Sequence, residues 1–236
     1  MANLFWQNCG VRVGGTNLSA YLNKVSLKVT AAALDATTFT NSYQVRLGGL
    51  KEITMEEGGF WDSTPDAVEF AGLGVADQAV TVIPTGAETE TAYLFQAGNF
   101  TYEQFGQVGD VVPFSASLFG TNAAGAVRGQ AAAINRSVSG TGQLGSVLTI
   151  AGPSATQYVY ATLHVQTAAT TITVQVQSAP TFAFAAPTTR ATIGPITTVG
   201  GTFMTRVIGP FTDGFWRFNV SAITGTFLVT GAVGVQ

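Results

Sequence analysis

The sequence predicts an all-β protein with one short helix, and three observations indicate this fold class. Glycine accounts for 28 of the 236 residues, and valine and threonine are also abundant, as in proteins built from strands and turns. Several segments alternate apolar and polar residues, as strands with one buried face do. Turn residues separate these segments at the spacing typical of antiparallel sandwiches.

Strands and one helix are expected in the first half of the chain. In the segment 21–30, Val25 and Leu27 lie on one face while Lys24 and Lys28 lie on the other, which indicates a half-buried strand. Further strands are predicted at 11–13, 79–84, 91–102, 112–119 and 127–134.

A helix-start signal follows residue 62. Ser63 or Thr64 is the predicted N-cap and Pro65 the first helical residue, since proline is favoured there. Gly72 and Gly74 are expected to end the helix early.

The segment from Leu34 to Asp62 is the most unusual part of the chain. A threonine-rich turn leads into a long alternating segment, interrupted by Gly48-Gly49. Strands usually have about 3–10 residues, so we expect two strands hinged at the glycine pair. Such a strand pair suits an element that leaves its own domain and joins a sheet shared with other copies.

The second half is expected to form an antiparallel β-sandwich of jelly-roll or immunoglobulin-like type, with strands at 158–166, 171–177, 203–208, 215–220 and 226–235. Residues 1–140 carry a net charge of −5 and residues 141–236 a net charge of +2. Because the Gly/Ser/Thr-rich stretch 137–145 lies between the halves, we predict two domains, 1–140 and 141–236.

Composition excludes several classes of protein. Charged residues make up only 10% of the chain, so the surface must be uncharged polar or covered by partner subunits. The net charge of −3 argues against a nucleic-acid binder held by phosphate contacts. No apolar run approaches the ~20 residues of a membrane span, and the amino terminus has no signal-peptide pattern. A single cysteine, Cys9, fits synthesis in a reducing cytoplasm.

No residue set supports catalysis, a cofactor or a metal. The only histidine, His164, lies inside a predicted strand, where packing is the better interpretation. Cys9 has no activating charge beside it in sequence. Gly140 to Gly145 matches G-x-G-x-x-G, but a strand rather than a helix follows, so we interpret it as a linker. The expectation is a protein that is not an enzyme.

Acidic and aromatic groups have alternative interpretations. A glycosidase needs two carboxylates about 5–10 Å apart, whereas Glu52 and Glu56 would lie roughly 13 Å apart along a strand. Glu52, Glu56, Glu57 and Asp62 therefore suit a solvated or pore-facing strand surface better. A second group of side chains could stack on sugars, but packing is the default interpretation; it comprises Phe60, Trp61, Phe215, Trp216 and Phe218.

Three motifs follow one another in the long segment: Leu34-Asp35-Ala36-Thr37-Thr38-Phe39, Gly49-Leu50-Lys51-Glu52 and Glu57-Gly58-Gly59-Phe60-Trp61-Asp62. Their order and spacing resemble the L-D-x-T-x-F turn, the G-L-K-(D/E) step and the E-G-x-(W/F)-D close of the major tail tube proteins of long-tailed, siphovirus-like bacteriophages. The second half, with LHVQ, ITVQVQS and a later GPFTD, resembles a β-sandwich module of virion proteins.

The resemblance implies a tail-tube-type β-sandwich or barrel domain with an added C-terminal sandwich. Six copies would form a ring around a channel that conducts DNA without binding it specifically, and rings would stack head to tail. The strands from Tyr43 to Glu57 would pair across subunits. The partners would be further copies and other tail proteins, and the protein would be made in the host cytoplasm and reside in the virion.

The resemblance also implies residue roles. The expected lumen-facing residues are Glu52, Thr54 and Glu56. The expected inter-subunit residues are Asp35, Thr38, Phe39, Tyr43 and Trp61, and the segment 1–10 is a further candidate for ring-to-ring contacts. Two alternatives stay open: a capsid decoration or other virion surface protein, and a carbohydrate-binding or adhesin module.

Overall fold

The structure is a computed structural model that describes residues 8–107 and 109–236. Most of the expected 1–10 contact segment, residues 1–7, therefore lies outside the described residues. The all-β prediction with one short helix is confirmed. The elements are β1 Gly10–Val13, β2 Thr16–Asn17, β3 Leu22–Asp35, β4 Arg46–Phe60, α1 Ser63–Gly72, β5 Gln78–Ile83, β6 Thr91–Gln104, β7 Pro113–Gly120, β8 Val127–Val138, β9 Gly142–Thr149, β10 Tyr158–Thr167, β11 Thr171–Ala179, β12 Thr188–Ile196, β13 Gly200–Phe203, β14 Val207–Ile208, β15 Phe215–Thr224 and β16 Phe227–Val235.

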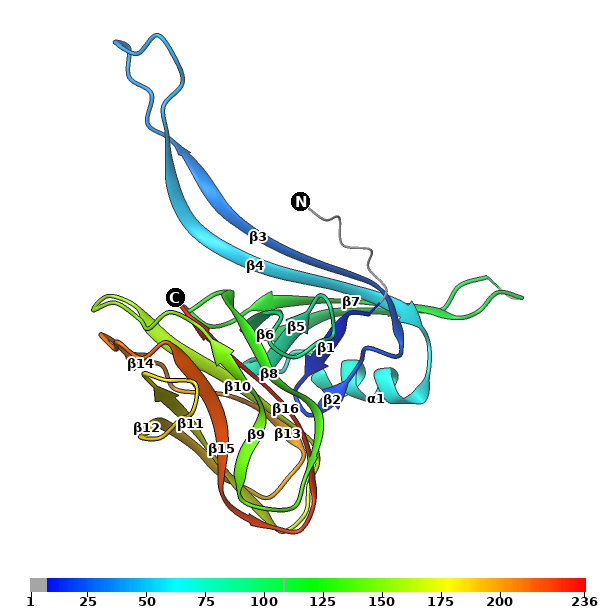
Figure 1. Cartoon of the computed structure of the whole chain (residues 1–236). Helices are drawn as coiled ribbons and strands as arrows, with labels where there is room; N and C mark the ends of the chain where they lie inside the picture. Colours follow the sequence, from blue (N-terminus) through cyan, green and yellow to red (C-terminus); the bar gives the residue numbers. More distant parts are fainter. Residues whose placement is uncertain (1–7, 108) are drawn as a thin grey trace.

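The strands form two antiparallel sheets. The larger sheet runs β13-β10-β16-β8-β6-β5-β1-β2, and from β6 it also continues through β7 and β4 to β3. The smaller sheet runs β12-β11-β15-β9. Figure 1 shows β3 and β4 as a long curved hairpin that projects from the body formed by the other strands.

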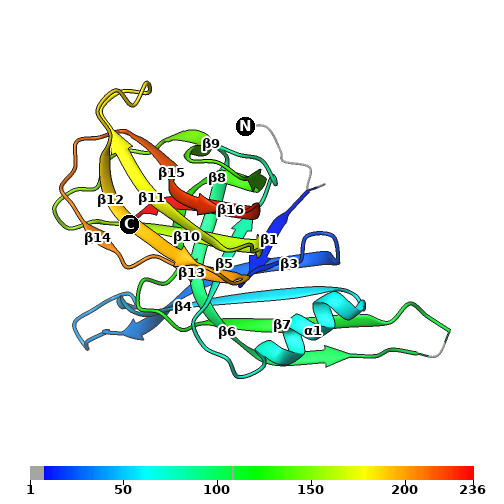
Figure 2. The same cartoon turned by 90° about the horizontal axis from the view of Figure 1, so that it is seen from below.

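The smaller sheet packs on one part of the larger sheet as a β-sandwich. Trp216, Phe218 and Val174 from the smaller sheet share a fully buried cluster with Leu163 and Val229 from the larger one. Alternation along β11, β15, β10 and β16 supplies the apolar face of each layer. Figure 2 shows these two layers at the end of the molecule away from α1.

A second buried cluster anchors the base of the projecting hairpin. Ile53 and Met55 of β4 pack with Val80 of β5, Phe95 of β6 and Leu118 of β7. The apolar residues of β4 have odd numbers here, so the strand's odd-numbered side chains face the core. The base of the hairpin is thereby fixed by the core of the body.

His164 is a packed sheet residue, as predicted. It is fully buried, and its Nδ1 lies 2.7 Å from the Gly14 carbonyl oxygen while its Nε2 lies 2.7 Å from Thr81 Oγ1. A carbonyl can only accept, so Nδ1 carries the proton and Nε2 accepts from the Thr81 hydroxyl. Thr81 Oγ1 in turn lies 2.7 Å from Thr162 Oγ1. One imidazole thus links β10 to β5 and to the β1–β2 turn.

The helix begins earlier than its sequence signal suggested. The N-cap is Asp62, whose side chain accepts a hydrogen bond from the Thr64 backbone N–H, so the Ser63 or Thr64 prediction is wrong and Pro65 is the third helical residue. Aspartate is as good an N-cap as serine, and it precedes both. The helix ends at Gly72, and it lies against β6 (Figure 2).

The glycine-rich stretch near residue 140 is not a linker. β8 continues to Val138 and β9 begins at Gly142, so Gly140 lies in a tight turn between two strands. A second correction concerns the single strand predicted at 203–208: β13 ends at Phe203 and β14 spans Val207–Ile208, with irregular backbone between them. The strand β12 was not predicted; its pattern of exposed threonines and half-buried positions gave no alternation to detect.

The expected hinge at Gly48-Gly49 is also wrong. β4 runs through both glycines without a break, and the irregularity is a bulge in β4. Ala31 pairs with Lys51 and Ala33 with Gly48, so Gly49 and Leu50 lie opposite Ala32 alone. A Cβ on Gly49 would lie 3.1 Å from the Ala32 Cβ. Glycine at position 49 therefore lets the bulged strand β4 pass close to β3.

Strand pairing crosses residue 140. β16 pairs with β8 from Phe227↔Val138 to Gly234↔Gly129, and β10 pairs with β16. The larger sheet therefore holds strands from both 1–140 and 141–236. The division into two domains stays a prediction. Within the described residues, no helix has the length and apolar character needed to cross a membrane.

Candidate functional site: the β3–β4 arm

The distal part of the β3–β4 hairpin extends beyond all other strands. β3 pairs with β4 from Leu22↔Gly59 to Asp35↔Arg46, whereas β7 pairs with β4 only from Thr54 to Phe60. We call residues 30–52 the arm. Within the described residues, β3 pairs with no strand other than β4. The arm therefore presents two unpaired strand edges, one on each side.

The arm is almost entirely solvent-exposed. Every residue from 30 to 52 is exposed except Ala36 and Gly49, which are half-buried. Several of the exposed side chains are large and apolar: Leu34, Phe39, Tyr43, Val45, Leu47 and Leu50. Leu50 is 90% exposed and Tyr43 is 86% exposed. A projecting hairpin with this much uncovered apolar surface is typical of an interaction site.

Local hydrogen bonds order the tip of the arm. The Asp35 carboxylate accepts from the Thr37 backbone N–H at 2.9 Å and from the Thr37 hydroxyl at 2.6 Å. The Thr37 hydroxyl oxygen accepts from the Val45 N–H at 2.9 Å. Thr38 N–H donates to Asn41 Oδ1 at 2.9 Å. These bonds account for the L-D-x-T pattern as an Asx-type turn, and the bonds from Thr37 lower the pKa of Asp35.

The three expected lumen-facing residues share one face of the hairpin. Cross-strand pairs Ser26↔Glu56, Lys28↔Thr54 and Thr30↔Glu52 place these side chains together, since alternate residues share a face. Glu52 and Glu56 are exposed and Thr54 is half-buried. Whether this face lines a channel stays a prediction.

Lysines balance the carboxylates on this face. Lys24 and Lys28 of β3 lie on the same side as Glu52 and Glu56, and the Lys24 Nζ lies 3.7 Å from a Glu56 carboxylate oxygen. The sequence reasoning counted only the glutamates of β4, because it treated 21–30 as a separate half-buried strand. The face is therefore charged but close to neutral.

The expected inter-subunit residues are not all brought together. Asp35, Thr38, Phe39 and Tyr43 lie at or beside the tip of the arm, and the Phe39 side chain is fully exposed. Trp61 lies at the opposite end of β4, where its backbone N–H donates to the Val112 carbonyl at 2.7 Å. It is 43% exposed. Their role in contacts between subunits stays a prediction.

Glu57, which the sequence reasoning grouped with the solvated carboxylates, is buried. It is 1% exposed, as is Glu69 of α1. Burial first, and then the Glu69 charge, raise the pKa of Glu57 well above its usual value. The Asn99 side-chain amide donates to Glu69 Oε2 at 2.7 Å. Glu57 has the same odd parity as Ile53 and Met55, and that signal could have revealed its burial; its partner on α1 could not be found from sequence.

Among the residues that the structure describes, it brings together no metal-binding set and does not activate the Cys9 thiol. No group of three or more His, Cys, Asp or Glu side chains there could hold a metal ion. Burial raises the pKa of Cys9 to about 11, so the thiol stays protonated and is a poor nucleophile. Of the aromatic candidates, Trp216 and Phe218 are fully buried, while Phe60 is 52% exposed.

The fold and the arm define a two-sheet all-β protein with a projecting hairpin. No protein-family model and no curated protein matches the sequence. Among solved structures, the tail of an empty gene transfer agent particle with C6 symmetry is similar at 13% identity and a TM-score of 0.36, over 44% of this chain and 79% of that chain. The PVC sheath–tube complex of an extracellular contractile injection system is similar at 12% identity and a TM-score of 0.40, over 52% and 88% of the two chains.

A third similarity spans both halves of the chain. The SPP1 Dit protein, described as a paradigm of hub adsorption apparatus in phages that infect Gram-positive bacteria, is similar at 9% identity and a TM-score of 0.38, over 97% of this chain and 99% of that chain. The chain is thus structurally similar, at low identity, to components of phage and gene transfer agent tails. At these TM-scores the similarity by itself assigns no function, so a functional proposal has to rest on the geometry of the arm.

Proposed function

We propose that the protein is a structural tail component, and specifically a major tail tube subunit whose copies join through the arm into stacked rings around a channel for DNA. The observation that carries this proposal is an exposed hairpin with both edges unpaired. The motif resemblance in residues 34–62 points the same way. Further copies and other tail proteins would be its partners.

An unpaired strand edge favours pairing with another chain. Each edge offers backbone N–H and C=O groups that bind a neighbouring strand, and natural proteins usually shield such edges. The arm is shielded by no other described strand, and its apolar side chains are exposed. Because the two edges differ, one copy's edge would meet the other edge of the next copy. Such heterologous contacts close into rings or continue as filaments.

The charge-balanced face suits a channel wall that does not hold DNA. Binding to DNA phosphates depends on an excess of Lys and Arg, and here Lys24 and Lys28 share one face of the hairpin with Glu52 and Glu56. A ring lined by this face would add little net attraction for a polyanion. The proposal thus rests on charge balance and not on an acidic wall.

Electron microscopy of the purified protein over a range of concentrations tests the assembly. We expect hollow tubes or rings from the wild type and few or none from Leu50→Lys, because a charge on the arm would have to be buried in the contact. Phe182→Lys is the matched control: Phe182 is 64% exposed but precedes β12, far from the arm in sequence. A protein that stays monomeric and is retained on a glycan column would instead support the adhesin alternative.

A double charge reversal tests the channel face. Glu52→Lys with Glu56→Lys should leave tubes intact but slow DNA ejection from particles, because the face would then carry an excess of lysines. Glu90→Lys with Glu103→Lys makes the same charge change at two other exposed sites and should have no effect. Normal ejection from the first variant would show that Glu52 and Glu56 do not face the channel.

A further inference from the structure

Arg12 is a buried arginine with no carboxylate partner. It lies on β1 and is 2% exposed. Its Nη1 donates to the Val11 carbonyl at 3.0 Å and to Ser19 Oγ at 2.7 Å, and its Nη2 donates to Asn135 Oδ1 at 3.0 Å. Its Nε is buried and has no hydrogen-bond partner. All of these partners are neutral, so the positive charge is not compensated.

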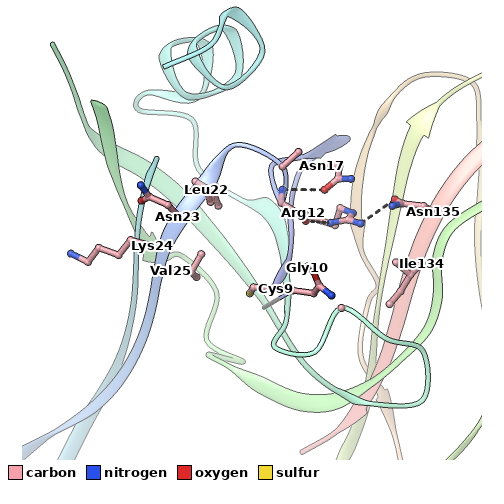
Figure 3. A pocket seen from close by; sticks show the side chains of 14 residues that line it. Cys9, Gly10, Arg12, Asn17, Leu22, Asn23, Lys24, Val25, Ile134 and Asn135 are labelled. Atoms are coloured by element: carbon pink, nitrogen blue, oxygen red, sulfur yellow. Dashed lines mark hydrogen bonds between the residues drawn. The ribbon is translucent and has the colours of Figure 1, made fainter. Parts of the chain in front are cut away.

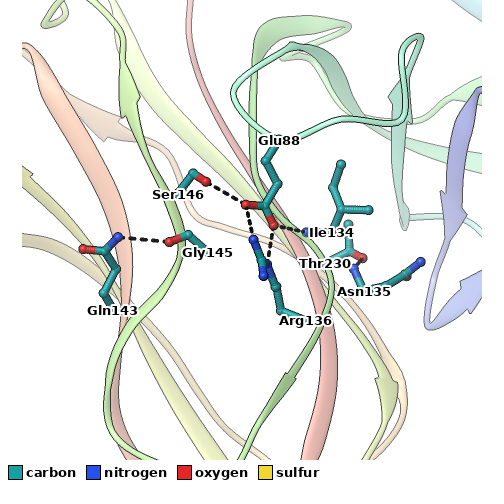
Figure 4. Close-up of polar contacts among 8 residues, drawn as sticks. All are labelled: Glu88, Ile134, Asn135, Arg136, Gln143, Gly145, Ser146 and Thr230. Atoms are coloured by element: carbon teal, nitrogen blue, oxygen red, sulfur yellow. Dashed lines mark hydrogen bonds and ion pairs between the residues drawn. The ribbon is translucent and has the colours of Figure 1, made fainter.

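The rest of the chain supplies no counter-charge to Arg12. Residues 1–7 and residue 108 contain no Asp or Glu, so every acidic side chain lies in the described part. Glu88 accepts from the backbone N–H of Ile134, the neighbour of Asn135, at 3.0 Å, but its carboxylate is paired: it accepts from Arg136 at 2.7 and 2.9 Å and from Ser146 at 2.7 Å (Figure 4). Burial lowers the pKa of Arg12 to about 10, and the only charge interaction that opposes this effect is with Cys9.

A polar cavity of about 480 Å³ opens beside Arg12 (Figure 3). Its polar wall is formed by Asn8, Asn17, Ser19, Asn23, Lys24 and Asn135. No Asp or Glu lines it. Apolar side chains, among them Leu22 and Ile134, form the rest of the wall.

The hydrogen bonds around the cavity leave donors free. Ser19 Oγ accepts from the Val11 N–H at 2.9 Å and from Arg12 Nη1, so its own proton is left to donate. Asn17 Oδ1 accepts from the Ser19 N–H at 3.1 Å, and Asn135 Oδ1 accepts from Arg12. The amide nitrogen of each asparagine can then serve as a donor. The wall thus combines a fixed positive charge with several donors.

We propose that this cavity binds an oxyanion of the carboxylate or phosphate class, held by Arg12 and the donors of Ser19, Asn17 and Asn135. A buried charge without a partner is strongly unfavourable, and a guanidinium pairs best with the planar oxygens of carboxylate or phosphate. The oxyanion can come from two sources: a free ion, or an acidic side chain of a second copy of the chain. The site lies outside the arm, but Lys24 of its wall also belongs to the charge-balanced face of the tube proposal. The free-ion source does not depend on that proposal, whereas the second-copy source rests on self-association.

Thermal unfolding tests binding of a free oxyanion. The wild type is measured in sodium chloride, sodium phosphate and sodium acetate at equal ionic strength and at a concentration low enough to keep it monomeric. If the site takes a free ion, phosphate or acetate raises Tm in a saturable way, by about 5–10 °C when the anion exceeds its Kd about 100-fold.

Asn135→Asp supplies the missing counter-charge within the chain. An aspartate keeps the acceptor for Arg12, and it tolerates the positive φ of 47° at this position. We expect this variant to have a raised Tm in chloride and no response to phosphate or acetate. Asn41→Asp is the matched control, since Asn41 is likewise a side-chain acceptor but lies at the tip of the arm; its response should equal that of the wild type.

Sedimentation velocity separates the two sources. If free anions do not change Tm but Asn135→Asp weakens self-association at least tenfold while Asn41→Asp does not, the oxyanion is a carboxylate of a second copy. The proposal is overturned if neither Tm nor self-association responds, or if Asn135→Asp and Asn41→Asp behave alike in both measurements.

Discussion

Glu57 of β4 and Glu69 of α1 bury two carboxyl groups in one interface. The groups that face them are Asn99 and Tyr102 of β6 and Asp66 of α1, and the Tyr102 hydroxyl donates to Asp66 at 2.8 Å. None of these groups is cationic. Burial of the Glu57 side chain raises its pKa, and so does the neighbouring Glu69 charge. The pair is therefore best satisfied when it shares a proton.

This pair should make the protein less stable in alkaline solution. The pKa of Glu57 in the folded protein lies well above its usual value of 4.5. The stabilising contribution of the protonated pair is therefore complete below pH 4.5, and it is lost as pH rises from there through the raised pKa. Glu57→Gln removes the titration, so Tm at pH 8 should rise by about 2–4 °C for each kcal/mol recovered. Calorimetry at pH 5 and pH 8 measures this. Glu103→Gln, on an exposed part of β6, should change neither value, and an equal pH dependence in Glu57→Gln and the wild type would contradict the shared proton.

His164 gives the opposite slope in acid. Burial lowers its pKa from 6.5 to about 4, so the unfolded chain takes up a proton that the folded chain refuses. Stability is complete above pH 6.5 and falls as pH decreases toward 4, by at most about 1.4 kcal/mol per pH unit. As His164 is the only histidine, His164→Asn should be less stable at pH 7 and lose most of this slope. Urea unfolding at pH 7 and pH 5 measures the stability and its pH dependence. An unchanged pH dependence in His164→Asn would show that His164 does not cause it.

Among the strands, the alternation of apolar and polar residues located most elements, because this pattern marks a strand with one buried face. The strands β6, β8, β10, β11 and β16 began within about one residue of their predicted starts. The same signal fails where neither face is buried. The arm portion of β3, residues 31–35, is exposed on both faces, so the predicted strand stopped at Thr30.

The turn between β8 and β9 shows why composition misled at residue 140. The glycines of this stretch were interpreted as a sign of a flexible linker, whereas Gly145 is required for steric reasons. Its φ is +72°, and a Cβ there would lie 2.1 Å from the Ala132 carbonyl oxygen. No local pattern reveals that β9 must cross so close to β8. The arm's edges and the Arg12 cavity were hidden for the same reason, because both depend on strands far apart in sequence.

A pair of glycine substitutions separates flexibility from packing. Gly145→Ala should destabilise the protein by about 3 kcal/mol or more, since the added methyl group meets backbone and the positive φ is strained. Gly140→Ala has no neighbour within 4 Å of the added Cβ and should change stability by less than about 0.5 kcal/mol. Urea unfolding compares the two variants. Equal effects would mean that this stretch acts as the flexible linker that its composition suggested.

In the molecule as a whole, residues 1–140 share the larger sheet with strands from residues 141–236. In the larger sheet, β8 contributes Ala132 and Ala133 to the same buried cluster as Leu163, Val229 and Trp216. Cutting the chain at residue 140 uncovers this apolar face of β8. It also removes the hydrogen bonds of β16 along β8 and leaves Thr81 without His164.

We therefore expect residues 1–140 expressed alone to be much less stable than the full chain and to aggregate through the exposed β8 edge. A matched deletion that keeps the larger sheet is not possible by truncation, because β16 is the last strand. The control is instead the full chain with a protease site placed in the exposed turn at 139–141. After cleavage the two pieces should stay associated and unfold together in a single calorimetric transition. Two independent transitions, or a folded and monomeric 1–140 fragment, would establish the two-domain division and leave the sandwich as an ornament on the tube-forming half.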